Sequence, residues 1–281
     1  MTRALGLLVP LVFIAACRTP GPGVLLGPDD PRPAALVAGL EVRAESPAAL
    51  RARARLDLDA RDVSLDRPQR LAVERPARLR VEVLGLFDQL AAVVVTNGDT
   101  YQVFDARSRD LEDGVVDPHL LWRVARVDLA PAEAVDLMLG GPRPDPSLRE
   151  GEAREHANGD VAVTRIDGDG LAREAYRFDA AGRVVEATLF DATGALAWRA
   201  AFDDYRAIAS PDGGEVAFAH DVRLEFPRVG ARARLVFKTV VLADDLPDAL
   251  FALELPGRSG RASYGPGGSV AHAHTGGLVT R

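Results

Sequence analysis

This 281-residue sequence contains very little cysteine and no long apolar segment beyond its start. Cys17 is its single cysteine, so no disulfide can form within the chain and the fold must be stable through its hydrophobic core alone. After residue 17, no apolar run approaches the about 20 residues of a membrane-spanning helix. Basic residues are in deficit, because 34 of them stand against 41 acidic residues and leave a net charge of −7. This balance disfavours nucleic acid and anionic membrane surfaces as electrostatic partners.

Familiar catalytic and metal-binding motifs are missing as well. The sequence has no G-x-S-x-G, no H-E-x-x-H and no glycine-rich loop that leads into Gly-Lys. Residues 167–170, DGDG, begin like a calcium loop, but Leu171 and Ala172 stand where a ligand and a glycine are needed. We interpret this segment as a hairpin turn. We therefore expect a protein that is not an enzyme and that uses no cofactor or metal.

The first residues have the pattern of a bacterial secretory signal. Arg3 supplies a positive start, and the run from Leu5 to Ile14 is apolar apart from one glycine and one proline. Such a run is too short for a membrane helix and suits a signal peptide. Residues 14–17, IAAC, resemble a lipobox, which predicts removal of residues 1–16 and triacylation of Cys17. Three acyl chains would anchor the protein firmly, since one chain binds only marginally. The alternative is an ordinary signal peptide with an incidental cysteine.

Two segments of unusual composition set the expected limits of the folded domain. Residues 17–33 hold the lipidated cysteine and a proline- and glycine-rich stretch, which is typical of a semi-extended tether. Residues 257–281 are rich in glycine and small polar residues, which is typical of a flexible tail. The domain is therefore expected over residues 34–256, a length that suffices for one large β domain.

Alternating patterns between these limits predict antiparallel β structure. In residues 51–60 and 78–86, apolar residues alternate with charged ones, as they do in strands with one solvated face. In residues 89–105, two apolar runs flank Asn97-Gly98, a strong hairpin signal. Further strands are expected in a meander over residues 157–205, which has Asp, Asn and Gly turns about every eleven residues, and at 216–226 and 231–242.

Three short helices are expected among the strands. The first lies near residues 34–40. Asp117 can cap a second helix that begins at Pro118. Pro131 starts a third, and Gly140-Gly141 stops it. We expect the second and third helices to form a layer that closes the core.

Four segments together carry a resemblance to a known family. Residues 74–107 are similar to a run in which a proline and an arginine-rich strand lead to an apolar loop and a hairpin. Residues 128–144 are similar to a proline-initiated helix that ends in a Leu-Gly-(x)-Pro turn. Residues 176–205 and 222–256 are similar to paired strands and closing strands. These patterns resemble the LolA/LolB family of lipoprotein carriers, the lipidated LolB-type receptor especially, although the glycine-rich tail departs from the family pattern.

The resemblance implies a mainly β fold with a few short helices, namely an incomplete antiparallel β-barrel closed by a helical lid over an apolar cavity for acyl chains. It also implies an apolar residue on the loop after the arginine-rich strand that contacts the membrane, here Leu86 or Phe87. The alternative is that both side chains turn inward and pack. Candidate cavity and lid residues are Val93 and Val95 or their alternates on the sheet, and Leu121, Val124, Val135, Leu137 and Met138 on the helices.

The expected function is that of a lipid-anchored envelope protein that binds acyl chains of lipoproteins or other lipids, in lipoprotein localisation to the outer membrane. Arg18 is not the aspartate that retains lipoproteins in the inner membrane of enteric bacteria, so we expect the periplasmic face of the outer membrane. Its partners are then acyl chains and the membrane reached through Cys17, with no nucleic acid, and the chain is expected to be monomeric. The alternative is an accessory envelope lipoprotein with a packed core that acts by protein–protein docking, and a periplasmic hydrolase is a distant third.

Overall fold

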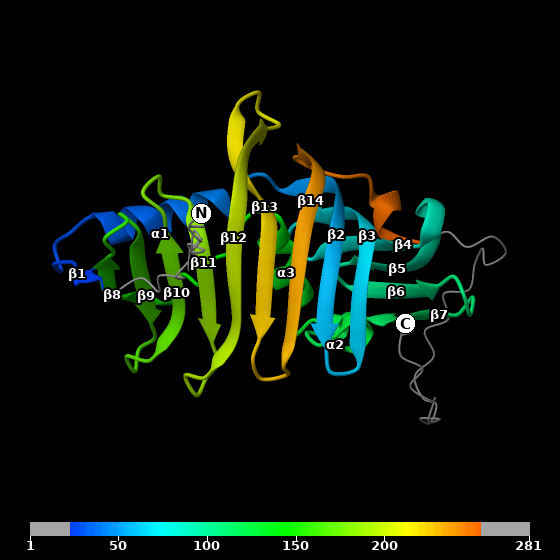
Figure 1. Ribbon diagram of the computed structural model, residues 1–281, viewed down its shortest axis with the longest axis horizontal. Coiled ribbons are helices and arrows are strands. Elements are labelled where there is room, and N and C mark those ends of the chain that lie inside the picture. Colours follow the sequence, from blue (N-terminus) through cyan, green and yellow to red (C-terminus); the bar gives the residue numbers. More distant parts are fainter. Residues whose placement is uncertain (1–22, 254–281) are drawn as a thin grey trace, which may run out of the picture.

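The computed structural model describes residues 23–253, and its strands form one antiparallel sheet (Figure 1). The predicted signal peptide, Cys17 and the predicted tail lie outside the described residues. The sheet has 14 strands in the order β1-β8-β9-β10-β11-β12-β13-β14-β2-β3-β4-β5-β6-β7. The strands are β1 (Val24–Leu25), β2 (Ala49–Ala60), β3 (Val63–Glu74), β4 (Arg78–Leu84), β5 (Leu90–Asn97), β6 (Thr100–Asp105), β7 (Leu111–Val115), β8 (Arg149–Glu155), β9 (Val161–Ile166), β10 (Ala172–Phe178), β11 (Val184–Phe190), β12 (Leu196–Ala209), β13 (Glu215–Phe226) and β14 (Ala231–Ala243).

Three α-helices of the described chain lie on one face of this sheet, which we call the inner face (Figure 1). The first crosses the strands of the meander, and the other two lie behind the middle of the sheet. Apolar residues of all three helices share one core cluster with the strands. The helices are α1 (Arg32–Arg43), α2 (Leu120–Ala125) and α3 (Pro131–Met138), and two 3-10 turns are η1 (Leu86–Asp88) and η2 (Asp248–Phe251).

The sheet is open. Its two halves, β8 to β14 and β2 to β7, meet where β14 pairs with β2, from Arg232–Asp59 to Ala243–Ala49. Strands β1 and β7 form the two edges, and no ladder joins them within residues 23–253. The predicted class, a mainly antiparallel β fold with short helices and an incomplete barrel, is therefore confirmed, with the sheet extended rather than closed on itself.

Most predicted elements appear where the sequence placed them. The strands expected at 51–60, 78–86, 216–226 and 231–242 correspond to β2, β4, β13 and β14. The Asn97-Gly98 turn joins β5 to β6, and Gly98 adopts a φ of +102°, which only glycine reaches without strain. The turns of the predicted meander link β8 through β12 in order. Period-two alternation and turn chemistry thus suffice for this part of the fold.

Three differences from the expected elements stand out. Strand β3 was not predicted, although it pairs with both β2 and β4. Residues 23–33 of the predicted tether include β1, whose Val24 pairs with Glu155, and the first two residues of α1. Helix α2 begins two residues after Pro118, although the Asp117 carboxylate accepts the expected hydrogen bond, from the His119 N–H at 2.8 Å.

The main core lies between the inner face and the helices, and a smaller one lies on the opposite, outer face. The segment after β14 crosses the outer face, where Leu246 and Phe251 cover Ala49, Ala72 and Val95. Strands β2, β3 and β5 are consequently apolar on both faces in this region. Among the described residues, none of the helices combines the length and hydrophobicity that crossing a bilayer requires.

Candidate functional site

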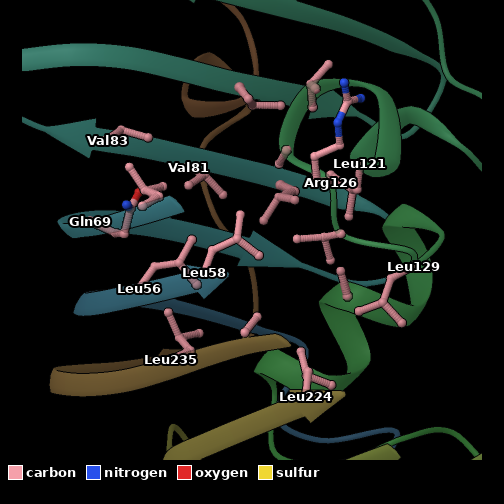
Figure 2. A pocket seen from close by; sticks show the side chains of 18 of the residues that line it. Leu56, Leu58, Gln69, Val81, Val83, Leu121, Arg126, Leu129, Leu224 and Leu235 are labelled. Atoms are coloured by element: carbon pink, nitrogen blue, oxygen red, sulfur yellow. The ribbon is translucent and has the colours of Figure 1, made fainter. Parts of the chain in front are cut away.

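An apolar cavity of about 210 Å³ lies between the inner face of the sheet and helices α2 and α3 (Figure 2). This volume is well above the about 10–15 Å³ that admits one water molecule, and cavities lined by aliphatic side chains bind apolar molecules in preference to water. The sheet contributes most of the lining, from β2 through β5 and from β13 and β14. The larger aliphatic residues among these are Leu56, Leu58, Leu65, Leu71, Leu79, Leu224 and Leu235.

Strand alternation explains why these side chains point inward. In β2, Leu56 and Leu58 face the cavity while Asp57 and Asp59 are exposed on the outer face. In β4, Leu79, Val81 and Val83 line the cavity, and the residues between them stand on the outer face. There the Arg80 guanidinium donates to the Glu82 carboxylate at 2.8 Å. Charged outer positions and aliphatic inner positions therefore fix which face holds the cavity.

Helix α3 is fastened to the sheet at both of its ends. Pro131 occupies its first turn, and the Glu133 carboxylate accepts the Ala130 N–H at 2.7 Å and the Trp198 indole N–H at 3.3 Å. Farther along, the Asp136 carboxylate accepts a hydrogen bond from the Arg75 guanidinium at 2.9 Å. These two carboxylates hold the helix over the cavity, so that its apolar side faces the sheet.

Helix α2 closes the cavity with a charged rim. Arg126 ends the helix in the left-handed conformation, and its guanidinium pairs with Asp62 in the turn between β2 and β3 at 2.9 Å. Arg123 pairs with Asp117 at 2.8 Å. Arg123 and Arg126 belong to the cavity lining but are both neutralised by carboxylates. The cavity lining is thus apolar apart from Gln69 and these two paired arginines.

The helical candidates divide into two groups. Leu121 and Val124 of α2, and Leu137 and Met138 of α3, line the cavity. Val135 does not, because it faces the main core and is completely buried there. Val135 thus belongs to the helix that covers the cavity but not to the cavity lining, since α3 packs against the sheet over a wider arc than the cavity occupies.

Of the two possible faces of β5, the cavity uses the alternates and not Val93 and Val95 themselves. Val93 and Val95 are each 1% exposed and lie outside the cavity. Val95 packs on the outer face beneath Leu246 and Phe251, and alternation places Val93 on that same face. Their alternates, Ala92 and Val94, line the cavity instead, opposite Val83 and Val81 of β4.

The loop between β4 and β5 presents two apolar side chains to solvent. Leu86 is 82% and Phe87 is 93% exposed, so neither turns inward to pack. Phe87 and Asp88 both have positive φ angles, of 58° and 59°, in a region that L-residues seldom occupy. The Gly85 N–H donates to the Gln89 carbonyl at 2.8 Å and closes the loop.

An ion pair fastens this loop to the outer face of β2. The Arg53 guanidinium donates to the Asp88 carboxylate at 2.5 Å. This hydrogen bond lowers the pKa of the Asp88 carboxyl from its ordinary value of 3.8. The charged contact therefore helps to hold Phe87 and Asp88 in their positive-φ conformations. In this conformation of the loop the Leu86 and Phe87 side chains point into solvent.

One feature of the site was missed from the sequence. The contribution of β3 to the cavity, Val63, Leu65, Gln69 and Leu71, was missed because β3 itself was not predicted. The recoverable signal was the alternation of these residues with polar ones. Within residues 23–253, no three histidine, cysteine or carboxylate side chains are grouped to hold a metal ion.

Comparison with solved structures places this architecture among known folds. A DUF1329 family protein from Desulfovibrio piger matches with a TM-score of 0.50 and 14% identity, over 78% of this chain and 97% of that one. A LolA superfamily protein from Nitrosomonas europaea matches with a TM-score of 0.48 and 13% identity, over 77% of this chain and 97% of that one. A putative outer membrane lipoprotein-sorting protein domain from Vibrio parahaemolyticus matches with a TM-score of 0.47 and 14% identity, over 78% and 96%.

These similarities concern the fold and not the activity. The DUF1329 match, with a TM-score of 0.50 at 14% identity, shows a shared fold, while the likeness to the LolA/LolB family remains the resemblance of sequence patterns described above. No family model matches the sequence, and no curated protein matches it either. The function must therefore be argued from the cavity and the loop themselves.

Proposed function

We propose that this chain is a lipid-anchored envelope protein that binds acyl chains of lipoproteins or other lipids in the cavity beneath α2 and α3. It acts in the localisation of lipoproteins, from the periplasmic face of the outer membrane. Cys17 carries the anchor, and Arg18 after it supports the outer-membrane location. Binding takes place by burial of the chain against aliphatic side chains, without a chemical step.

The observation that carries this proposal is the aliphatic cavity on the inner face. A packed core would leave no such space, because protein interiors have few voids larger than a water molecule. An apolar ligand gains about 0.8 kcal/mol of binding free energy for each CH₂ group that it buries. A long acyl chain has many such groups and therefore gains the most from binding here. The neutralised rim of Arg123 and Arg126 offers little attraction to a charged ligand.

The exposed pair Leu86 and Phe87 supports the membrane step of the proposal. Large apolar side chains that are this exposed mark interaction surfaces when they stand together. Both lie on a loop that strained backbone and the Arg53–Asp88 pair hold away from the core. In the proposed function these side chains enter the bilayer while an acyl chain passes between cavity and membrane.

Native mass spectrometry of the purified chain tests the cavity. The Cys17→Ser variant is used, so that any acyl group detected belongs to a ligand. We expect retained acyl ligands, and we expect Ala92→Phe to lose them because Ala92 lines the cavity. Ala217→Phe, on the exposed side of β13, is the matched control and should retain them. An empty Cys17→Ser protein that associates stably with another protein would favour the docking alternative.

A further inference from the structure

One polar side chain is buried in the lining of the aliphatic cavity. Gln69 of β3 is 1% exposed and stands near Val83 and Leu56, which also line the cavity (Figure 2). Its Nε2 group donates to the Arg67 carbonyl at 3.5 Å. Its Oε1 atom has no hydrogen-bond partner. A buried amide oxygen without a donor is uncommon in folded proteins and costs stability.

The orientation of this amide follows from its neighbour. The Arg67 carbonyl can only accept a hydrogen bond, so it takes the NH₂ end of Gln69 and leaves Oε1 without a donor. A leucine at position 69 would complete the aliphatic lining without an unpaired atom. The missing donor can instead come from a bound molecule, and Oε1 then selects ligands that carry an N–H or O–H group.

The position of Gln69 along the cavity indicates which part of an acyl ligand reaches it. Gln69 pairs with Val83, the last cavity-lining residue of β4 before the loop that carries Leu86 and Phe87. A chain that extends from there toward α2 and α3 places its apolar tail among the leucines and its linkage group beside Gln69. An amide linkage has an N–H donor, whereas an ester linkage has only acceptors.

On the basis of the proposed acyl-chain binding, we propose that Gln69 is a specificity residue that selects amide-linked over ester-linked acyl chains. The ligand amide N–H donates to Gln69 Oε1, and the chain fills the aliphatic cavity. A ligand with an ester at this place leaves Oε1 unpaired and adds the repulsion of a second acceptor. Sites built to receive a donor discriminate against analogues that lack it.

Displacement of a fluorescent fatty-acid analogue from the full Cys17→Ser chain tests this proposal. The two competitors are N-methylpalmitamide and methyl palmitate, which have the same length and differ in the N–H group. We expect the amide to bind about tenfold more tightly. Gln69→Met should remove the preference, and Gln69→Leu serves if the methionine variant does not fold. Leu79→Met, elsewhere in the same lining, should keep it.

Each result leads to a separate conclusion. Equal binding of the two competitors by the Cys17→Ser chain, or an unchanged preference in folded Gln69 variants, overturns the role of Gln69 and leaves acyl-chain binding intact. Failure of both competitors to displace the probe overturns the proposed function itself. An N-palmitoylated dipeptide and N-palmitoylethanolamine then separate the two sources of amide-linked chains, acylated protein termini and amide lipids, and tighter binding of either one supports the amide assignment.

Discussion

The double substitution Leu86→Ser and Phe87→Ser separates stability from membrane contact. Both side chains are almost fully exposed, so their removal should change the free energy of unfolding by no more than about 0.5 kcal/mol. Phe87→Gly should even stabilise the protein, by about 0.5–1 kcal/mol, because glycine adopts a φ of 58° without steric cost. Chemical denaturation of each variant measures these changes.

The effect on membrane affinity should be far larger. Complete burial of one leucine or phenylalanine side chain contributes about 1.5–3 kcal/mol, and 82% and 93% of these two side chains are available for burial. Together they should contribute about 3–5 kcal/mol, so the double variant should bind lipid vesicles about 100- to 4000-fold less tightly. Co-sedimentation of residues 17–281 carrying Cys17→Ser with vesicles of neutral phospholipid measures this affinity, because the apolar residues 5–14 are then absent.

Leu171→Ser supplies the control for surface hydrophobicity. Leu171 is 45% exposed and lies in the turn between β9 and β10, far from β4 and β5 in the strand order. Its substitution should leave vesicle binding unchanged. A folded double variant that still binds vesicles as the parent does would refute the reasoning about the loop. So would a loss of several kcal/mol in stability, because phenylalanine truncation costs that much only in a core.

Three further predictions concern other parts of the chain. Cys17→Ser should abolish incorporation of labelled fatty acid in cells, and label on the variant would contradict the lipobox. Deletion of residues 258–281 should leave the melting temperature nearly unchanged, since these residues offer little apolar surface to bury. Arg53→Ala should return the lowered pKa of Asp88 toward 3.8, as carboxyl NMR can follow. The Arg53–Asp88 contact stabilises the fold fully above about pH 3.8, and this stabilisation is lost as the pH falls through the lowered pKa and Asp88 protonates. An Asp88 pKa that is not lowered in the parent chain would contradict the pairing.

The sequence predicts the second half of the sheet better than the first for a physical reason. Strands β9 to β14 alternate between inner and outer residues, and Asp, Asn and Gly turns separate most of them. Strand β3 has a proline at position 68, which argues against a central strand. Its ladder with β4 extends only to Gln69, so Pro68 lies beyond the end of that ladder and its missing N–H breaks no bond there.

The face of β5 that lines the cavity could not be chosen from the sequence, because it depends on one extra residue. The run 90–96, LAAVVVT, is apolar at nearly every position, because η2 and its neighbours cover its outer face while the cavity lies on the inner one. Alternation therefore does not indicate which residues of β5 face the cavity. The register with β4 decides it, and a bulge shifts that register between Val83 and Leu84.

The consequence of this bulge can be followed pair by pair. Leu84 pairs with Leu90, and an unbroken ladder from there would set Val81 opposite Val93, with Val93 facing the cavity. The bulge adds one residue on β5, so that Val81 faces Val94 instead. A shift of one residue exchanges the two faces of a strand. The location of the cavity lining on β5 thus depends on a single unpaired residue beside the Leu86–Phe87 loop, which the apolar sequence on either side does not reveal.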